Sequence, residues 1–281
     1  MSKKQLIMEK SLELFATNGI EATSIQQITE KCGISKGAFY LSFKSKDELV
    51  FGLIDYFMGE FIADIEQSVN EKHPNDNLLY NLYHTIFHTF QKHSYFAKLL
   101  IKEQLKSFNI ELLEQMNKYN EFINAIIFTV VKRQFPRINE SMHADLVYII
   151  KAFIKQYGEL FFISNYRINL TVLCHALVEK TTVIAKHTTI PFISTDILSS
   201  TNAECLSPTK EELIDLLTKK KTEVTDSIVQ RSIELLQDDL TNQQLSPAIT
   251  QGLLKNVKED SHCKWVAYLY ELYVKKQRTV L

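Results

Sequence analysis

Four residues suited to DNA contact lie within five consecutive positions of the sequence: Lys36, Gly37, Ala38 and Tyr40. A lysine can neutralise a phosphate or donate to a guanine edge, a tyrosine hydroxyl can donate to a phosphate, and an alanine can lie against a thymine methyl. Glycine inside a helix costs about 1 kcal/mol relative to alanine, which close approach of backbone to a base or phosphate would explain. Structural readings remain, since Gly37 could permit close helix packing and Tyr40 could cover an apolar edge. The combination at this spacing favours a surface that reads duplex DNA.

Two short helices are expected to position these residues. Ser24 can cap the first helix, with Gln27 three residues later as the partner of a capping box. Gly33 then suits a left-handed helix end, and Ser35 can cap the second helix. The pattern predicts a helix-turn-helix whose second helix presents residues 36–40 outward.

Phosphate contacts are expected on both sides of this second helix. Ser45 can begin a further helix with Glu48 as its capping partner, and Lys46 at the start of that helix can bind phosphate. Thr23 and Ser24 offer a similar contact on the other side. The serines are caps with or without DNA, and a lone lysine is most often a solvated surface charge.

The sequence of residues 4–55 resembles the N-terminal DNA-binding domain of the TetR family of bacterial repressors. The matching residues are Ile7, Leu14, Phe15, Gly19, Thr23, Ile28, Gly33, Ile34, Ser35, Lys36, Gly37, Tyr40, Phe43, Lys46 and Leu49. The predicted DNA-contacting residues are therefore Thr23, Ser24, Ser35, Lys36, Gly37, Ala38, Tyr40 and Lys46. Leu41 and Ser42 fall where family members vary to set sequence preference, which leaves the operator sequence open.

Composition and charge exclude several other classes of protein. The 281 residues are 45% hydrophobic and carry a net charge of −1, unlike a protein coated in basic charge for nonspecific nucleic-acid binding. Residues 1–46 hold seven lysines against four glutamates, so a locally basic DNA-binding segment is expected on a near-neutral body. No apolar leader and no apolar run of membrane-spanning length are visible, which predicts a cytoplasmic protein without membrane contact.

No cofactor or catalytic centre is predicted. The four cysteines are widely separated and predict reduced thiols: Cys32, Cys174, Cys205 and Cys263. His84 and His88 form an i, i+4 pair that could hold a metal ion or haem, as could His175 with Cys174, but further ligands at a convincing spacing are missing. Buried or pocket-edge histidines are the favoured interpretation. P-loop, GxGxxG, HExxH and GxSxG motifs are absent, which argues against an enzyme.

The chain is expected to be all-α. It has only seven glycines and five prolines, and no sustained period-2 pattern. Helices are expected at 4–17, 45–71, 77–93, 95–106, 109–134, 141–166 and 170–187. The predicted domains are a helix-turn-helix DNA-binding domain at 1–50, a helical ligand-binding and dimerisation domain at 51–190, and a linker with a helical C-terminal extension at 191–281.

The resemblance implies a ligand pocket among the helices of the central domain. Aromatic residues recur there at helical spacing, and those expected to line the pocket are Tyr83, Phe87, Phe90, Phe96, Phe122 and Phe128. Their number favours a small apolar or amphipathic effector, although such residues, Phe108 included, could equally be plain core. The glutamates Glu103, Glu111, Glu114 and Glu121 could serve a cationic effector, but a charge series on a helix is more often a solvated face.

The helices at 141–166 and 170–187 are rich in apolar residues, and their exposure in a monomer would be unfavourable. By resemblance they should form a homodimer through a four-helix bundle. The residues expected at that seam are Leu146, Ile149, Ile150, Phe153, Val172, Leu173, Ala176 and Val183. The alternative is that these side chains belong to an internal core.

The segment from about 191 exceeds the usual family length. Residues 195–208 resemble a linker in composition, and Ser207 with Pro208 predicts the start of one long helix that ends near Leu240. Another helix is expected from Ser246, and Trp265 should lie on the buried face of a last one. Residues 207–281 carry eleven basic and eleven acidic residues, which argues against a second nucleic-acid site.

The sequence as a whole predicts a DNA-binding transcriptional regulator. In the main hypothesis it is a homodimeric repressor that a small effector releases from a palindromic, double-stranded DNA operator. In the alternative, a protein partner controls it through the C-terminal extension.

Overall fold

The computed structural model describes residues 3–70, 77–102, 110–162, 167–193, 206–242 and 245–279. Glu103, Phe108, Cys205 and most of the predicted linker lie outside these ranges. Within them the chain forms helices and contains no strand, which confirms the predicted all-α fold.

The helices fall into three groups that follow one another along the chain. The N-terminal group comprises α1 (Lys3–Asn18), α2 (Ile25–Cys32) and α3 (Lys36–Tyr40). The body comprises α4 (Lys46–Asn70), α5 (Leu78–Lys92), α6 (Ser94–Lys102), α7 (Ile110–Gln134), α8 (Glu140–Gly158) with the 3-10 turn η2 (Glu159–Phe162), and α9 (Leu170–His187). The extension comprises α10 (Lys210–Glu223), α11 (Ser227–Asn242), α12 (Pro247–Glu259), the 3-10 turn η5 (Ser261–Cys263) and α13 (Lys264–Thr279).

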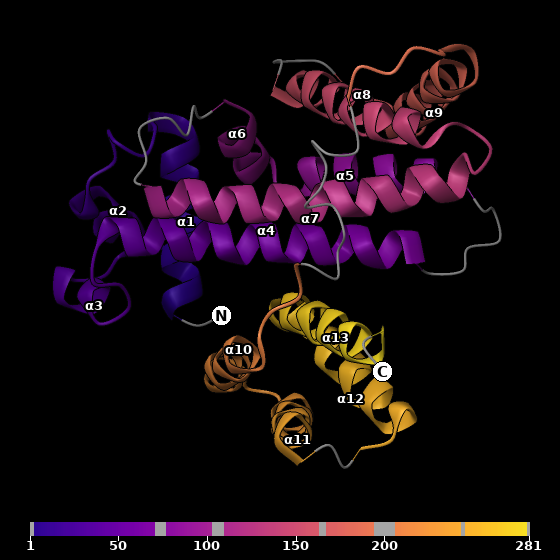
Figure 1. Ribbon diagram of the computed structural model, residues 1–281. Helices are drawn as coiled ribbons and strands as arrows, with labels where there is room; N and C mark the ends of the chain where they lie inside the picture. Colours follow the sequence, from indigo (N-terminus) through magenta and orange to yellow (C-terminus); the bar gives the residue numbers. More distant parts are fainter. Residues whose placement is uncertain are drawn as a thin grey trace.

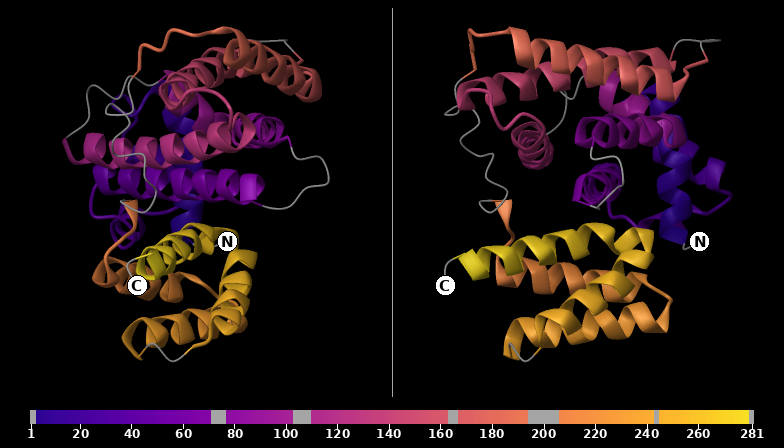
Figure 2. Two further views of the ribbon diagram at one scale, coloured as in Figure 1. Left: turned by 45° about the vertical axis from the view of Figure 1, so that its right-hand side comes forward. Right: turned by 90° about the vertical axis from the view of Figure 1, so that its right-hand side faces the viewer.

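The long helices α4 and α7 run side by side through the middle of the molecule (Figure 1). Helices α8 and α9 cover one side of the body, whereas α10 to α13 lie on the opposite side. Two further views show the same separation (Figure 2). The helix-turn-helix group sits at one end of α4, so this helix joins the N-terminal group to the body.

Helix α4 is buried over most of its circumference. Its first turns bury Leu49 and Leu53 in the core of the N-terminal group. Further along, the Phe57 ring stacks on Phe96 of α6 with centroids 4.8 Å apart, and the Phe61 ring stacks on Phe90 of α5 at 6.0 Å. A helix that is apolar nearly all round must be covered on several sides, and here the body and the extension cover it.

The extension docks on α4 at a glycine. A Cβ atom at Gly59 would lie only 2.7 Å from the Trp265 ring of α13, so only a glycine lets the two helices approach this closely. Lys264, one residue earlier, donates from Nζ to Asp64 Oδ1 of α4 at 2.7 Å. The extension is therefore packed on the body by one buried aromatic contact flanked by an ion pair.

The prediction of one long helix from Ser207 to about Leu240 is wrong. Helix α10 begins after Thr209, whose side chain caps it with Glu212 as capping-box partner, and it ends at Glu223. A second helix then starts because the Asp226 carboxylate accepts hydrogen bonds from the backbone N–H groups of residues 228 and 229. The cap ends the helix although the amphipathic pattern continues.

Two of the residues predicted for a dimer seam lie inside the subunit instead. Leu146 and Ile150 are fully buried, because α8 turns its most apolar face toward α5 and α7. Helix α8 also ends at Gly158 and passes into η2, earlier than predicted. On α9, by contrast, Val172 and Val183 are 62% and 52% exposed.

Replacing Gly59 by alanine should loosen the extension. Alanine is the better helix former by about 1 kcal/mol, yet overpacking against Trp265 should outweigh this gain and lower the free energy of unfolding by about 1–3 kcal/mol. Gly252 of α12 is the matched control, since a Cβ there meets nothing within 4 Å, and Gly252→Ala should stabilise the protein. Urea unfolding of both variants measures the change in the free energy of unfolding. A stabilised Gly59→Ala protein would contradict the close packing.

Candidate nucleic-acid interface

The turn between α2 and α3 has the capping geometry that the sequence predicts. Ser24 Oγ accepts from the backbone N–H of Gln27 at 3.2 Å, and the Gln27 side chain accepts from the backbone N–H of Ser24 at 2.8 Å. Gly33 is left-handed, with φ of 65°. Local hydrogen bonds and one glycine thus set the angle between the two helices.

Helix α3 holds its apolar side inward and its predicted contact residues outward. Ser35 Oγ accepts from the backbone N–H of Ala38 at 3.2 Å, which caps the helix. Phe39 is fully buried, whereas Lys36 and Gly37 are exposed and Ala38 is half-buried. Tyr40 is 52% exposed and packs edge-on against the Phe39 ring.

Packing within the described part of the chain does not explain Gly37. Its φ is not positive, and a Cβ added there would meet only Ser35 Oγ, at 3.8 Å. The fold therefore leaves space for a side chain at this position, and close packing of two helices is not the reason for the glycine. The contact of Gly37 with DNA stays a prediction.

Two predicted phosphate contacts also have roles inside the fold. Lys46 Nζ donates to the carbonyl oxygens of Ile20, Glu21 and Thr23 at 3.0, 3.4 and 3.4 Å. The Thr23 side chain is buried, and its hydroxyl donates to the carbonyl oxygen of Gly19 at 2.8 Å. These two residues hold the turn between α1 and α2, while the Ser24 side chain remains exposed.

The charges around this surface are unequally compensated. Glu13 of α1 accepts from Lys10 at 2.9 Å and pairs with Lys31 of α2 at 3.2 Å. The hydrogen bond from Lys10 lowers the pKa of the Glu13 carboxyl, followed by that from Lys31. Lys36 has only a long contact, 3.5 Å, with the neutral Gln26 side chain. Its positive charge is therefore the one that the outward face of α3 presents.

Leu41 was not among the predicted contacts, although the resemblance places it where family members vary to set sequence preference. It follows α3 directly and is 88% exposed, an unusual state for a large apolar side chain. Only the resemblance indicated a role for it, because periodicity alone assigns none to a single residue beyond a helix end. A thymine methyl is the base feature that suits such a side chain.

The six aromatic residues predicted for a ligand pocket fall into separate places. Tyr83, Phe87 and Phe90 of α5 are buried beneath α9 and η2, where Phe87 stacks on Phe161 at 5.6 Å. Tyr83 bonds through its hydroxyl to Thr181 Oγ1 of α9 at 2.8 Å.

The other three of the six rings lie elsewhere. Phe96 is buried against Phe57, as described above. Phe122 packs edge-on against Trp265 of the extension, and Phe128 packs edge-on against His143. The pocket assignment of the six rings stays a prediction.

The predicted histidine pair belongs to a row of stacked rings. His84 and His88 have centroids 5.9 Å apart, and Tyr80 lies 5.7 Å from His84 and 4.8 Å from His175 of α9. Burial, followed by the neighbouring His88, lowers the pKa of His84. In the described ranges no three His, Cys, Asp or Glu side chains gather closely enough to hold a metal ion.

Comparison with known proteins identifies the N-terminal group. Residues 7–53 match the family described as bacterial regulatory proteins, tetR family. The chain carries a tetR-family DNA-binding domain. It is accordingly a transcriptional regulator and not an enzyme, and the tetR-family resemblance of the sequence is confirmed.

Relatives extend the similarity beyond the tetR-family domain. The HTH-type transcriptional regulator YerO of Bacillus subtilis (strain 168) is 26% identical over 264 residues, which cover 91% of this chain and 89% of that protein. A match of this extent includes most of the C-terminal extension. Within the described ranges, no helix combines the length and the apolar content that crossing a membrane requires.

Solved structures share the fold of about two thirds of the chain. FadR from Bacillus subtilis, solved with stearoyl-CoA, matches with a TM-score of 0.54 and 19% identity over 66% of this chain and 99% of that one. AibR, solved with isovaleryl coenzyme A and operator DNA, matches with a TM-score of 0.52 and 16% identity over 64% of this chain and 97% of that one. Both matches leave about a third of this chain uncovered, which corresponds to the length of the extension.

Replacing Gly37 by alanine should separate stability from DNA binding. The Cβ has space in the free protein, so the free energy of unfolding should stay level or rise by up to about 1 kcal/mol. Operator affinity should nevertheless fall about tenfold or more, because the Cβ occupies the space that a base or phosphate needs. Thermal unfolding and gel-shift titration measure the two effects, and unchanged affinity would show that Gly37 does not approach DNA.

Proposed function

We propose that this regulator is a homodimeric repressor that a small apolar or amphipathic molecule releases from a palindromic operator. The observation that carries the DNA-binding part is the outward face of α3, where packing among the described residues does not require Gly37 and no carboxylate among them pairs with Lys36. Lys36, Gly37, Ala38 and Tyr40 are the proposed base-reading residues. Ser24 and Ser35 contact the flanking phosphates, together with the turn that Thr23 and Lys46 hold.

The body offers a place for the effector beside α4. Phe90 of α5 contacts Phe61 of α4 on one side and Phe161 of η2 on the other. Phe87 stacks on Phe161, so the rings of three elements meet between the covering helices and α4. An apolar chain that enters here has to separate these rings and so displaces α4, which leads directly to the DNA-binding domain.

The relatives support an amphipathic effector. FadR and AibR were solved with acyl-CoA molecules, and AibR with operator DNA as well. An acyl chain is the kind of guest that buried phenylalanine rings accept, while the charged part of such a molecule stays near solvent. In the proposed site, the rings around Phe90 accept the acyl chain, and the charged part of the molecule stays near solvent.

Two subunits are proposed to associate through α8 and α9. Val172 and Val183 are 62% and 52% exposed on α9, and Tyr148 is 41% exposed on α8. Helices α8 and α9 lie on the side of the body opposite to the extension (Figure 1). Association would cover apolar surface and place two recognition helices for half-sites about one helical turn apart, or a multiple of this distance.

An acyl-CoA should weaken operator binding, and the operator should weaken acyl-CoA binding by the same factor. Calorimetry with stearoyl-CoA and with isovaleryl-CoA, in the presence and absence of operator DNA, tests this linkage. Phe90→Leu should lower acyl-CoA affinity, whereas Phe135→Leu, a buried ring just beyond the end of α7, serves as the matched control. Equal affinity with and without operator would rule out release by these molecules, even if they bind.

Val183→Glu should convert the dimer to a monomer, because a charge in an apolar seam loses its hydration without gaining a partner. Ile228→Glu on α11 is the control, since Ile228 is 64% exposed but lies in the extension. Light scattering gives the mass of each variant. A dimeric Val183→Glu protein beside a monomeric Ile228→Glu protein would place the seam in the extension.

A further inference from the structure

A cavity of about 650 Å³ lies between the body and the extension. Helix α7 forms one wall, α10 and α13 form the others, and residues 206–208 lie at its edge. Its volume is within the range of small-molecule binding sites. Helices α10 and α13 lie on the side of the body opposite to α8 and α9 (Figure 1), and the rings of Phe87, Phe90 and Phe161 are not among the residues that line the cavity.

Three aromatic rings line this cavity. The Trp265 ring is half-buried, and the rings of Tyr119 and Phe122 meet it edge-on with centroids 6.0 and 5.1 Å away. Tyr119 is held in place because its hydroxyl donates to Asp55 Oδ1 at 2.6 Å. Such a fixed group of rings suits a flat or bulky aromatic guest and attracts positive charge through the ring faces.

Carboxylates outnumber ammonium groups in the lining. Four acidic residues contribute, namely Asp55, Glu121, Glu212 and Asp215, against Lys118 and Lys219. Glu212 already accepts from the backbone at the start of α10, and Asp55 accepts from Tyr119. Glu121 and Asp215 form no ion pair with any lysine or arginine of the described ranges.

We propose that this cavity binds a bulky aromatic organic cation and that its occupation acts on the DNA-binding domain. The rings supply apolar contact and cation–π attraction, and Glu121 with Asp215 supply the countercharge. A neutral guest would leave those carboxylates partly desolvated without a partner, and an anion such as an acyl-CoA would be repelled. The proposal therefore concerns a second class of ligand and does not depend on the acyl-CoA site.

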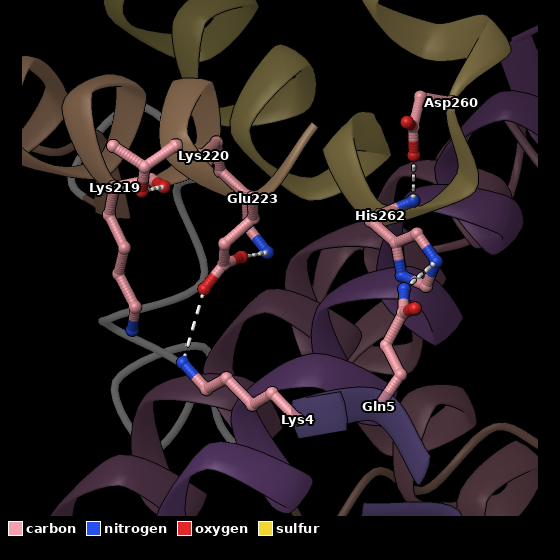
Figure 3. A network of polar contacts seen from close by, with 8 residues as sticks. Lys4, Gln5, Lys219, Lys220, Glu223, Asp260 and His262 are labelled. Atoms are coloured by element: carbon pink, nitrogen blue, oxygen red, sulfur yellow. Dashed lines mark hydrogen bonds and ion pairs between the residues drawn. The ribbon is translucent and has the colours of Figure 1, made fainter. Parts of the chain in front are cut away.

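Two walls of the cavity are connected to α1 of the DNA-binding domain by polar contacts (Figure 3). Lys219 lines the cavity, and Glu223 one turn later accepts from Lys4 of α1 at 3.2 Å. On the other wall, His262 of η5 precedes Trp265 by three residues in the sequence. Its ring contacts the Gln5 side chain of α1. A guest that moves α10 away from α13 thus changes the contacts at the start of α1.

Calorimetry of the full chain with tetraphenylphosphonium tests the site, because tetraphenylborate has the same shape and the opposite charge. The cation should bind and the anion should not, and the paired substitutions Glu121→Gln and Asp215→Asn should weaken the cation roughly tenfold or more. Glu114→Gln is the matched control, an exposed carboxylate on α7 outside the cavity. Equal binding of the two ions, or unchanged cation affinity in the paired variant, would overturn the site.

Gel-shift titration of operator DNA, with and without saturating tetraphenylphosphonium, tests the coupling. Operator affinity should change several-fold in the wild-type protein and less in Glu223→Gln, which weakens the contact with Lys4. Glu234→Gln is the control, because Glu234 pairs only with Lys221 and Arg231 within the extension. Operator affinity that is the same with and without the cation would overturn the coupling.

Discussion

The burial of α4 on several sides is the constraint on which the remaining structure depends. This one helix of 25 residues begins in the DNA-binding domain, crosses the body and carries the extension. Leu49 packs in the N-terminal group, the Phe61 ring stacks on a ring of the body, and Gly59 contacts Trp265 of the extension. A packed interior deforms little, so a displacement at any of these places is passed along the helix. In the proposed function, this shared helix couples the DNA-binding domain, the body and the extension.

Contacts within the protein set the geometry of the recognition surface. The left-handed Gly33 and the caps of α2 and α3 set the helix angle through bonds between residues close in sequence. Lys46 adds a longer-range restraint, since its ammonium group joins the start of α4 to the carbonyl oxygens of the α1–α2 turn. The Lys46 ammonium group, which could contact phosphate, thus also stabilises the fold of the domain. Its removal would weaken DNA binding through the orientation of α2 as well as through any direct contact.

Sequence reasoning succeeded where the cause is local and failed where it is not. The capping box at Ser24 and the left-handed Gly33 depend on neighbours within a few residues, and both were predicted correctly. The break before α11 was missed because apolar residues recur at helical spacing on both sides of the cap at Asp226. Periodicity also identified α8 as apolar, but it could not show that Ile150 faces the interior of its own subunit. Which face is exposed depends on partners far away in the sequence.

The extension shows the same limit and explains why a second ligand site was not foreseen. Trp265 was expected on a buried face, but nothing in its own helix indicates that its partner is a glycine of α4. Glu121 was noted only as one of a series of charges along α7, and its place opposite Asp215 appears once α10 is in position. The two proposed sites are formed by different residues, and their proposed ligands carry opposite charges. Because both lead to the same DNA-binding domain, one through α4 and the other through the start of α1, their ligands would be linked to each other through DNA affinity even without any contact between them.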